Sequence, residues 1–270
     1  MKAVLIFLLL TTILHAEFLV SNVEITIGDI QSDGGARVHE SVQFLMFGDY
    51  SSSLYDSGIS QNSLSYWSSI TGLKDVKMHV NTANVHIQDF RLRPQPRTSC
   101  NPIQGTCHGE LILDYWAYPT INDSTPVPGT GLFNLDKYKP RTTRYTLNPT
   151  SLSFTTTEEG SVVLDENTNL IIQLPVDSIL LDVNPYTEED LDLPEHISEL
   201  SWNDIVLVKF SLVFDVEEGI DKEISDFFTN ISLNISETLS TAEGFALIIL
   251  IAILIGSYLY IVMAKRRGED

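Results

Sequence analysis

Apolar and polar residues alternate in the first part of the chain, a pattern that predicts half-buried β-strands. The alternation runs through residues 23–27 and again through residues 38–46, and a tight-turn sequence at residues 32–35 joins the two runs. This arrangement predicts a β-hairpin. Glu40 falls on the apolar side of the second run, so the hairpin would bury a carboxylate that needs a partner such as an arginine.

A second hairpin is predicted at residues 76–90, where apolar residues alternate on both sides of residues 81–84. If residues 81–84 form the loop, His79 and His86 face each other across the two strands. Two histidines on one face can chelate Cu²⁺, Ni²⁺ or Zn²⁺, although two ligands alone make a weak site. The pair is therefore either a metal site that a nearby carboxylate completes or part of an ordinary solvated sheet face.

Further strands are predicted at residues 110–117, 143–147, 151–157, 161–164, 169–174 and 205–216. Helical signal is sparse before residue 217, although residues 187–190 resemble a capping box that opens a short acidic helix. Many short strands with turns between them predict an all-β ectodomain at residues 17–216 with the fold of an antiparallel β-sandwich. It forms either one large sandwich or two small ones divided near residues 120–140.

The periodicity changes at residue 217, where apolar residues begin to recur at steps of three and four, as on an amphipathic helix. This predicts a membrane-proximal stalk helix at residues 217–243. Its apolar stripe consists of Ile220, Ile224, Phe227, Phe228, Ile231, Ile235 and Leu239. The stripe either packs on the sandwich or binds a partner, which is a second copy of the chain or a helix of another membrane protein.

The 20 residues from Phe245 to Ala264 include no charged side chain, and a helix of that length spans a bilayer, so residues 244–264 are predicted to be a transmembrane helix. The basic residues at 265–267 place the short tail, residues 265–270, in the cytoplasm. Residues 1–16 have the charge, apolar stretch and small terminal residue of a secretory signal peptide. Together these segments predict a single-pass type I protein of the cell membrane with its N-terminus outside.

The chain is acidic, with a net charge of −20. Residues 145–208 have no Lys or Arg but contain 13 acidic residues. Such a surface is unsuited to nucleic acid, which is bound through clustered cations. The acidic half serves solubility, or it docks a cationic partner or a divalent cation. Two basic stretches, at residues 91–97 and 137–144, are expected either to pair with this acidic half or to contact an anionic glycan or a partner protein.

The two cysteines, Cys100 and Cys107, lie close together in the region predicted to be exported, which predicts a disulfide closing a short loop. Sequons at Asn122, Asn230 and Asn234 predict a glycoprotein if they are occupied.

The sequence lacks the motifs of serine hydrolases, zinc proteases, phosphate-binding loops and dinucleotide-binding folds. We therefore expect a non-enzymatic protein without a cofactor. It would act as an accessory subunit of a membrane complex or as a surface recognition or structural module. The alternative is a membrane-anchored hydrolase of glycans, because Asp and Glu are abundant and such chemistry needs two carboxyl groups in a cleft.

Overall fold

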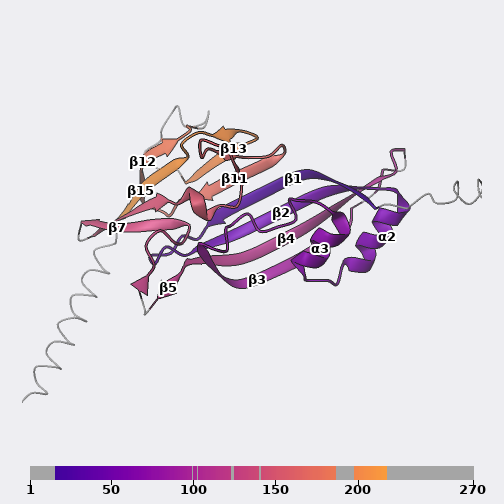
Figure 1. The fold of residues 1–270 in the computed structure, drawn as a ribbon, viewed down its shortest axis with the longest axis horizontal. Helices are drawn as coiled ribbons and strands as arrows, with labels where there is room; N and C mark the ends of the chain where they lie inside the picture. The colour runs from indigo at the N-terminus through magenta and orange to yellow at the C-terminus, as the bar shows by residue number, and fades with distance from the viewer. Residues whose placement is uncertain are drawn as a thin grey trace, which may run out of the picture. The chain divides into compact units, whose positions relative to one another are not determined.

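A computed structural model describes residues 16–98, 100–101, 103–122, 125–139, 141–186 and 198–217. The described chain is mostly β-sheet with a few short helices (Figure 1), as predicted. The predicted signal peptide (except Ala16), acidic helix, stalk helix (except Glu217, which is in a strand) and transmembrane helix lie outside the described residues. Within the described residues, none of the helices has the length and apolar character needed to span a bilayer.

The larger sheet has six strands in the order β13-β11-β1-β2-β4-β3. These strands are β1 (Glu17–Gly28), β2 (Ala36–Phe47), β3 (Val85–Gln95), β4 (Thr106–Pro119), β11 (Thr168–Gln173) and β13 (Glu199–Asn203). The predicted first hairpin is confirmed, because β1 and β2 pair antiparallel with Ile25 opposite Glu40. Sequence reasoning predicted antiparallel pairing throughout, but β11 pairs with β1 in parallel. The alternation within a strand shows which residues are buried and does not specify the direction of the neighbouring strand.

A second sheet has four strands in the order β12-β15-β8-β7, and two smaller sheets complete the fold. The four strands are β7 (Phe133–Lys139), β8 (Thr142–Leu147), β12 (Ser178–Asn184) and β15 (Ser211–Glu217). The smaller sheets consist of β9 (Thr155–Thr156), β10 (Val162–Val163) and β14 (Val206–Leu207), and of β5 (Ile121–Asn122) and β6 (Thr125–Pro126). The strand predicted at residues 205–216 is interrupted near Lys209, whose φ of 51° turns the chain between β14 and β15. The strand predicted at residues 151–157 is only partly present. Its first residue ends the short helix η1 (Pro149–Ser151), and only β9 within it is a strand.

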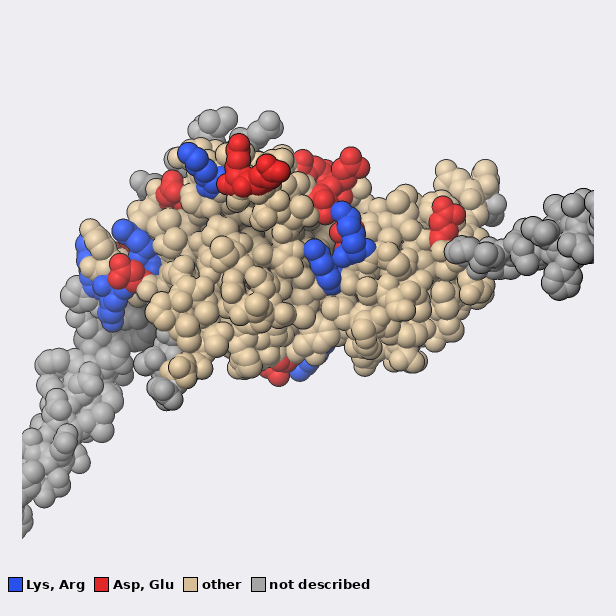
Figure 2. Space-filling view, viewed as in Figure 1, with Lys and Arg blue, Asp and Glu red and all other residues tan. Residues whose placement is uncertain are grey.

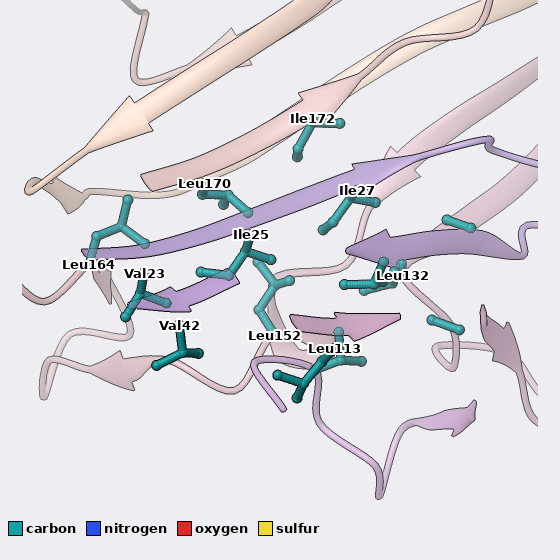
Figure 3. Packing of buried hydrophobic residues seen from close by; sticks show 14 of the residues in the cluster. Val23, Ile25, Ile27, Val42, Leu113, Leu132, Leu152, Leu164, Leu170 and Ile172 are labelled. Carbon is teal, nitrogen blue, oxygen red and sulfur yellow. The ribbon is translucent and has the colours of Figure 1, made fainter. Parts of the chain in front are cut away.

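Buried apolar side chains of both sheets form one core. Val23, Ile25 and Ile27 of β1 pack beside Leu170 and Ile172 of β11 (Figure 3). Each such side chain, fully removed from water, stabilises the fold by about 1.5–3 kcal/mol. The alternating positions of β1 therefore hold a strand from the second half of the chain against the first half.

Two short helices, α2 (Gly48–Gly58) and α3 (Leu64–Thr71), were not predicted. Both are rich in serine, a residue with only moderate helix propensity. Each inserts one aromatic residue into the core, Tyr55 from α2 and Trp67 from α3, and both side chains are fully buried. Gly109 of β4 makes room for the rings of Tyr55 and Phe44, because a Cβ atom there would lie 3.0 Å from the Tyr55 ring and 2.7 Å from the Phe44 ring.

The predicted second hairpin is wrong. Val80 makes only an isolated bridge to Leu152, and β3 pairs with β4, which places His86 opposite Tyr118. His79 and His86 are therefore not cross-strand partners. His79 is buried instead, whereas His86 is exposed on β3.

Glu40 is fully buried, as its position in the alternation predicted, but its partner is not an arginine. His79 lies with Nδ1 2.8 Å from Glu40 Oε2, and its backbone N–H donates to Glu40 Oε1 at 2.9 Å. The Tyr115 hydroxyl also donates to Oε1. The pKa of Tyr115 is raised well above its ordinary value by burial, by the negative charge of Glu40 and by this hydrogen bond.

Candidate ligand-binding site on the outer face of the six-stranded sheet

One face of the six-stranded sheet turns away from the core, and we call it the outer face. The alternation of β1 that buries Ile25 and Ile27 turns Thr26 to this side, and the register places His39 of β2 between Thr26 and Asp114 of β4. The functional side chains of the outer face are Arg37, His39, Arg93, Asp114, Trp116 and Gln173. They come from four different strands, so only the assembled sheet brings them together.

Asp114 is the centre of an ion-pair network on the outer face. Its side chain is only 10% exposed, and it accepts a hydrogen bond from His39 Nδ1 at 2.8 Å and pairs with the Arg93 guanidinium. Burial opposes ionisation of this carboxyl group, but the hydrogen bonds from His39 and Arg93 outweigh it, so the pKa of Asp114 lies below its ordinary value. Asp114 is therefore held as a carboxylate, and Nε2 is the ring nitrogen of His39 that remains for a ligand.

Arg37 lies between two carboxylates without a close hydrogen bond to either. Its guanidinium nitrogens are 3.7 Å from Asp114 Oδ1 and 3.8 Å from Asp29 Oδ2. Charge-assisted hydrogen bonds between these groups are about 2.7–2.9 Å long. The Arg37 side chain is 52% exposed, so its donors face solvent while the two carboxylates hold it in place electrostatically.

Two adjoining hollows open on the outer face. The first, which we call the Arg37 hollow, has a volume of about 270 Å³ and is lined by Thr26, Gly28, Asp29, Arg37, His39, Asp114 and Gln173. The second, the Trp116 hollow, has a volume of about 560 Å³ and is lined by residues 29–31, Trp116 and residues 173–176. Asp29 and Gln173 line both. The hollows therefore adjoin at these two residues.

Gly28 and Trp116 shape these hollows. A Cβ atom on Gly28 would lie 2.7 Å from Gln173 Oε1, so glycine allows this amide to lie across β1. The Trp116 ring stacks on Tyr118 two residues along β4, with ring centroids 5.9 Å apart and an angle of 22° between the planes. Trp116 is directly opposite Arg37 in the register of β2 and β4. A residue that lines the Arg37 hollow and one that lines the Trp116 hollow are thus cross-strand neighbours.

The predicted disulfide is confirmed, because Cys100 and Cys107 are bonded. Of the three sequons, Asn122 lies exposed in β5, and Asn230 and Asn234 lie outside the described residues, so glycosylation stays a prediction. The stalk stripe from Ile220 to Leu239 also lies outside them. In the part of the chain that the structure describes, no three His, Cys, Asp or Glu side chains come together in a way that could hold a metal ion.

The basic stretches are largely paired within the molecule. Arg93 pairs with Asp114 and Arg97 with Asp56, both acids of the first half, whereas Arg144 pairs with Asp215 at 2.9 Å across the second sheet. Figure 2 shows the same tendency on one face, where charged side chains of both signs gather in a few places with uncharged surface between them. Within the acidic stretch at residues 145–208, Asp182, Glu199 and Asp204 accept hydrogen bonds from Ser211 Oγ, Gln173 Nε2 and the backbone of Thr168, respectively.

Sequence reasoning identified Arg93 as a candidate contact but missed Arg37, His39, Asp114, Trp116 and Gln173. The alternation of β1 and β2 did indicate which residues face outward. It did not indicate that β4 lies beside β2 or that β11 lies beside β1, and those neighbours create the site.

No protein-family model matches the chain, and no curated protein matches its sequence. Among solved structures, native leukotriene A4 hydrolase from Saccharomyces cerevisiae aligns over 73% of this chain with 9% identity and a TM-score of 0.31. The chain spans only 28% of that hydrolase. AChBP from Bulinus truncatus aligns over 76% of this chain and 89% of its own, with 12% identity and a TM-score of 0.21. At these TM-scores neither likeness carries a functional argument.

Proposed function

We propose that the protein is an exported, membrane-anchored recognition module without enzymatic activity, whose β-sandwich ectodomain binds its ligand on the outer face. The observation that carries this proposal is the position of Arg37. Its half-exposed guanidinium lines the Arg37 hollow, lies beyond hydrogen-bond distance of both flanking carboxylates, and belongs to a residue opposite Trp116 in the register. Exposed arginine and aromatic side chains at a concave surface are typical of binding sites.

The chemistry of the site favours binding over hydrolysis. A glycosidase needs one carboxyl group that donates a proton and a second that acts as nucleophile or base. Asp114 has a lowered pKa and is tied to Arg93 and His39, so it is unsuited to donate a proton. Among neighbouring hydroxyl groups, Ser41 Oγ donates to Glu110 Oε1 at 2.6 Å and does not bond to His39. The alternative of a glycan hydrolase therefore has less support from this site.

The membrane anchor and the orientation rest on the sequence, through residues 1–16 and the apolar run from Phe245 to Ala264. The disulfide is typical of an oxidising compartment outside the cytoplasm. A role as an accessory subunit would require the stripe from Ile220 to Leu239 to bind a membrane partner. Recognition through the outer face is compatible with such a partner, because the two surfaces come from different parts of the chain.

A binding array tests this proposal on the full-length protein in detergent micelles. The array presents neutral sugars, acidic sugars and acidic and basic peptides to the wild type and to the Arg37→Gln variant. We expect the wild type to bind one class and the variant to lose that binding. Turnover of chromogenic glycosides, or no binding to any class, would contradict the proposal.

A further inference from the structure

We infer that the two hollows of the outer face bind a carboxylated sugar of the hexuronate type, with the carboxylate on Arg37 and the sugar ring against Trp116. This inference rests on the proposed function and names the ligand class of the same site. It depends on three features of the site: the donors of Arg37, the balance of charge around it, and the central position of the strands that line the hollows.

Arg37 supplies the carboxylate contact. A guanidinium presents a planar fork of donors that matches a carboxylate in a bidentate arrangement. Because its distances to Asp29 and Asp114 are 3.8 and 3.7 Å, a ligand can take up these donors without first breaking a short hydrogen bond. His39 adds a ring nitrogen on the same side, in the lining of the Arg37 hollow.

The charge around Arg37 permits an anion in spite of the acidic chain. The Asp114 carboxylate pairs with the Arg93 guanidinium and accepts a hydrogen bond from His39, which leaves Arg37 opposed mainly by Asp29. Asp29 is 63% exposed, so its charge is well screened by water. With a net charge of −20, the chain as a whole repels anions. An anion that binds here must therefore be selected by local contacts.

The remaining groups suit the hydroxyl groups and ring of a sugar. Asp29 and the amide of Gln173 line both hollows and can accept or donate hydrogen bonds to hydroxyl groups. Trp116 offers an aromatic surface, whose negative π-face attracts the C–H groups on one side of a sugar ring. A simple inorganic anion would use Arg37 but would gain nothing from Trp116 or Gln173.

The position of the site in the sheet disfavours an extended peptide. Peptides that bind β-sheets usually add a strand to an exposed edge through backbone hydrogen bonds. The Arg37 hollow lies over β11, β1, β2 and β4, which are all interior strands of the sheet, and the Trp116 hollow adjoins it beyond the ends of β1 and β11. A ligand in the Arg37 hollow cannot add a strand and must be recognised mainly through side chains, which suits a compact polar molecule.

Isothermal titration calorimetry of the full-length protein in detergent micelles tests the inference. The probes are D-glucuronate, D-glucose, acetate and a tri-glutamate peptide. We expect glucuronate to bind with a dissociation constant on the order of millimolar or tighter. We expect glucose and acetate to bind at least roughly tenfold more weakly, because each lacks one of the two recognised features.

Three variants locate the binding. Arg37→Gln and Trp116→Ala should each weaken glucuronate binding by roughly tenfold or more. Arg97→Gln is the matched control, because Arg97 pairs with Asp56 and lies outside the lining of both hollows. It should bind as the wild type does. An unfolding midpoint within a few degrees of the wild type would show that a variant is folded, and Trp116→Phe replaces Trp116→Ala if the latter is not.

Each outcome has a distinct meaning. Equal binding of acetate and glucuronate would overturn the sugar and leave an anion site, and equal binding of glucose would overturn the need for a carboxylate. Binding of tri-glutamate in place of glucuronate would replace the sugar by an acidic peptide. In these three cases loss of binding in Arg37→Gln would still support recognition at the outer face. Unchanged glucuronate binding in Arg37→Gln would overturn the site, and failure of every class in the array would overturn the proposed function itself.

Discussion

His79 Nδ1 lies 2.8 Å from Glu40 Oε2, with both side chains buried. Glu40 belongs to β2, and His79 belongs to the segment between α3 and β3. The hydrogen bond therefore ties this segment to the six-stranded sheet. It also supplies the partner without which a buried carboxylate would be severely destabilising.

Replacement of His79 by alanine should be strongly destabilising. His79→Ala leaves Glu40 with the Tyr115 hydroxyl and the backbone N–H of residue 79 but without the imidazole, and removes the packing of His79 on Phe154. We expect the free energy of unfolding to fall by about 1–3 kcal/mol, the usual cost of leaving a buried polar group without a hydrogen-bond partner, with a further loss from the packing. Denaturant unfolding of the full-length protein, followed by tryptophan fluorescence, measures the change.

His86→Ala is the matched control, because His86 is exposed on β3. Its effect should stay within about 0.5 kcal/mol, as for most surface substitutions. Equal effects of the two substitutions would show that the Glu40–His79 pair does not stabilise the fold.

The burial of Glu40 was predictable and its partner was not. Its place in the β2 alternation required it to face the core, because strand periodicity is strict. The partner comes from a segment 39 residues away that forms no regular strand. No local sequence pattern identifies a partner so far away in the chain. For the same reason, residues 76–80 were wrongly predicted to pair with β3.

The stabilisation from Asp114 should depend on pH in the acidic range. Its pKa is lower in the folded protein than in the unfolded chain, where the value is about 3.9. Its contribution is therefore complete above the unfolded pKa and is lost as the pH falls through the lower folded value. The difference in free energy of unfolding between the wild type and Asp114→Asn should be largest near neutral pH and shrink below about pH 4. Denaturant unfolding of both proteins across this range checks this, and a difference that stays constant down to pH 2 would contradict it.

The disulfide should contribute measurably to stability. Cys100 and Cys107 are seven residues apart, and closing a loop of that size lowers the entropy of the unfolded chain by an amount worth about 2.5 kcal/mol. The double variant Cys100→Ser/Cys107→Ser should unfold at a lower midpoint than the wild type. A reducing agent should lower the wild-type midpoint to a similar value and leave the double variant unchanged. A wild type insensitive to reduction would argue against this contribution.

Gly109 should not tolerate a side chain. In Gly109→Ala the new Cβ would lie 2.7 Å from the Phe44 ring, which is held in the core by Tyr55. Overpacking of this kind costs about 1–3 kcal/mol. Gly28→Ala is the control, because its Cβ would meet only the flexible end of Gln173. We expect a lower unfolding midpoint for Gly109→Ala and little change for Gly28→Ala. Little change in both would mean that the Phe44 and Tyr55 rings can shift to accommodate the new methyl group at low cost.

The fold was more predictable than the candidate site. Strong alternation in β1, β2 and β4 revealed the central strands. Strands such as β7, in which only Phe133 is buried, have no such pattern and were missed. The site depends on cross-strand neighbours such as Arg37 and Trp116, and these follow from sheet order, which local periodicity does not encode.

Photo-crosslinking with a diazirine derivative of D-glucuronate on the full-length protein tests recognition at the outer face most directly. Peptides that carry the label are then identified by mass spectrometry. We predict labels within β2, β4 and the segment from β11 to residue 176, and competition by unmodified glucuronate. Labelling confined to other parts of the chain, or labelling that glucuronate does not reduce, would contradict recognition at this face.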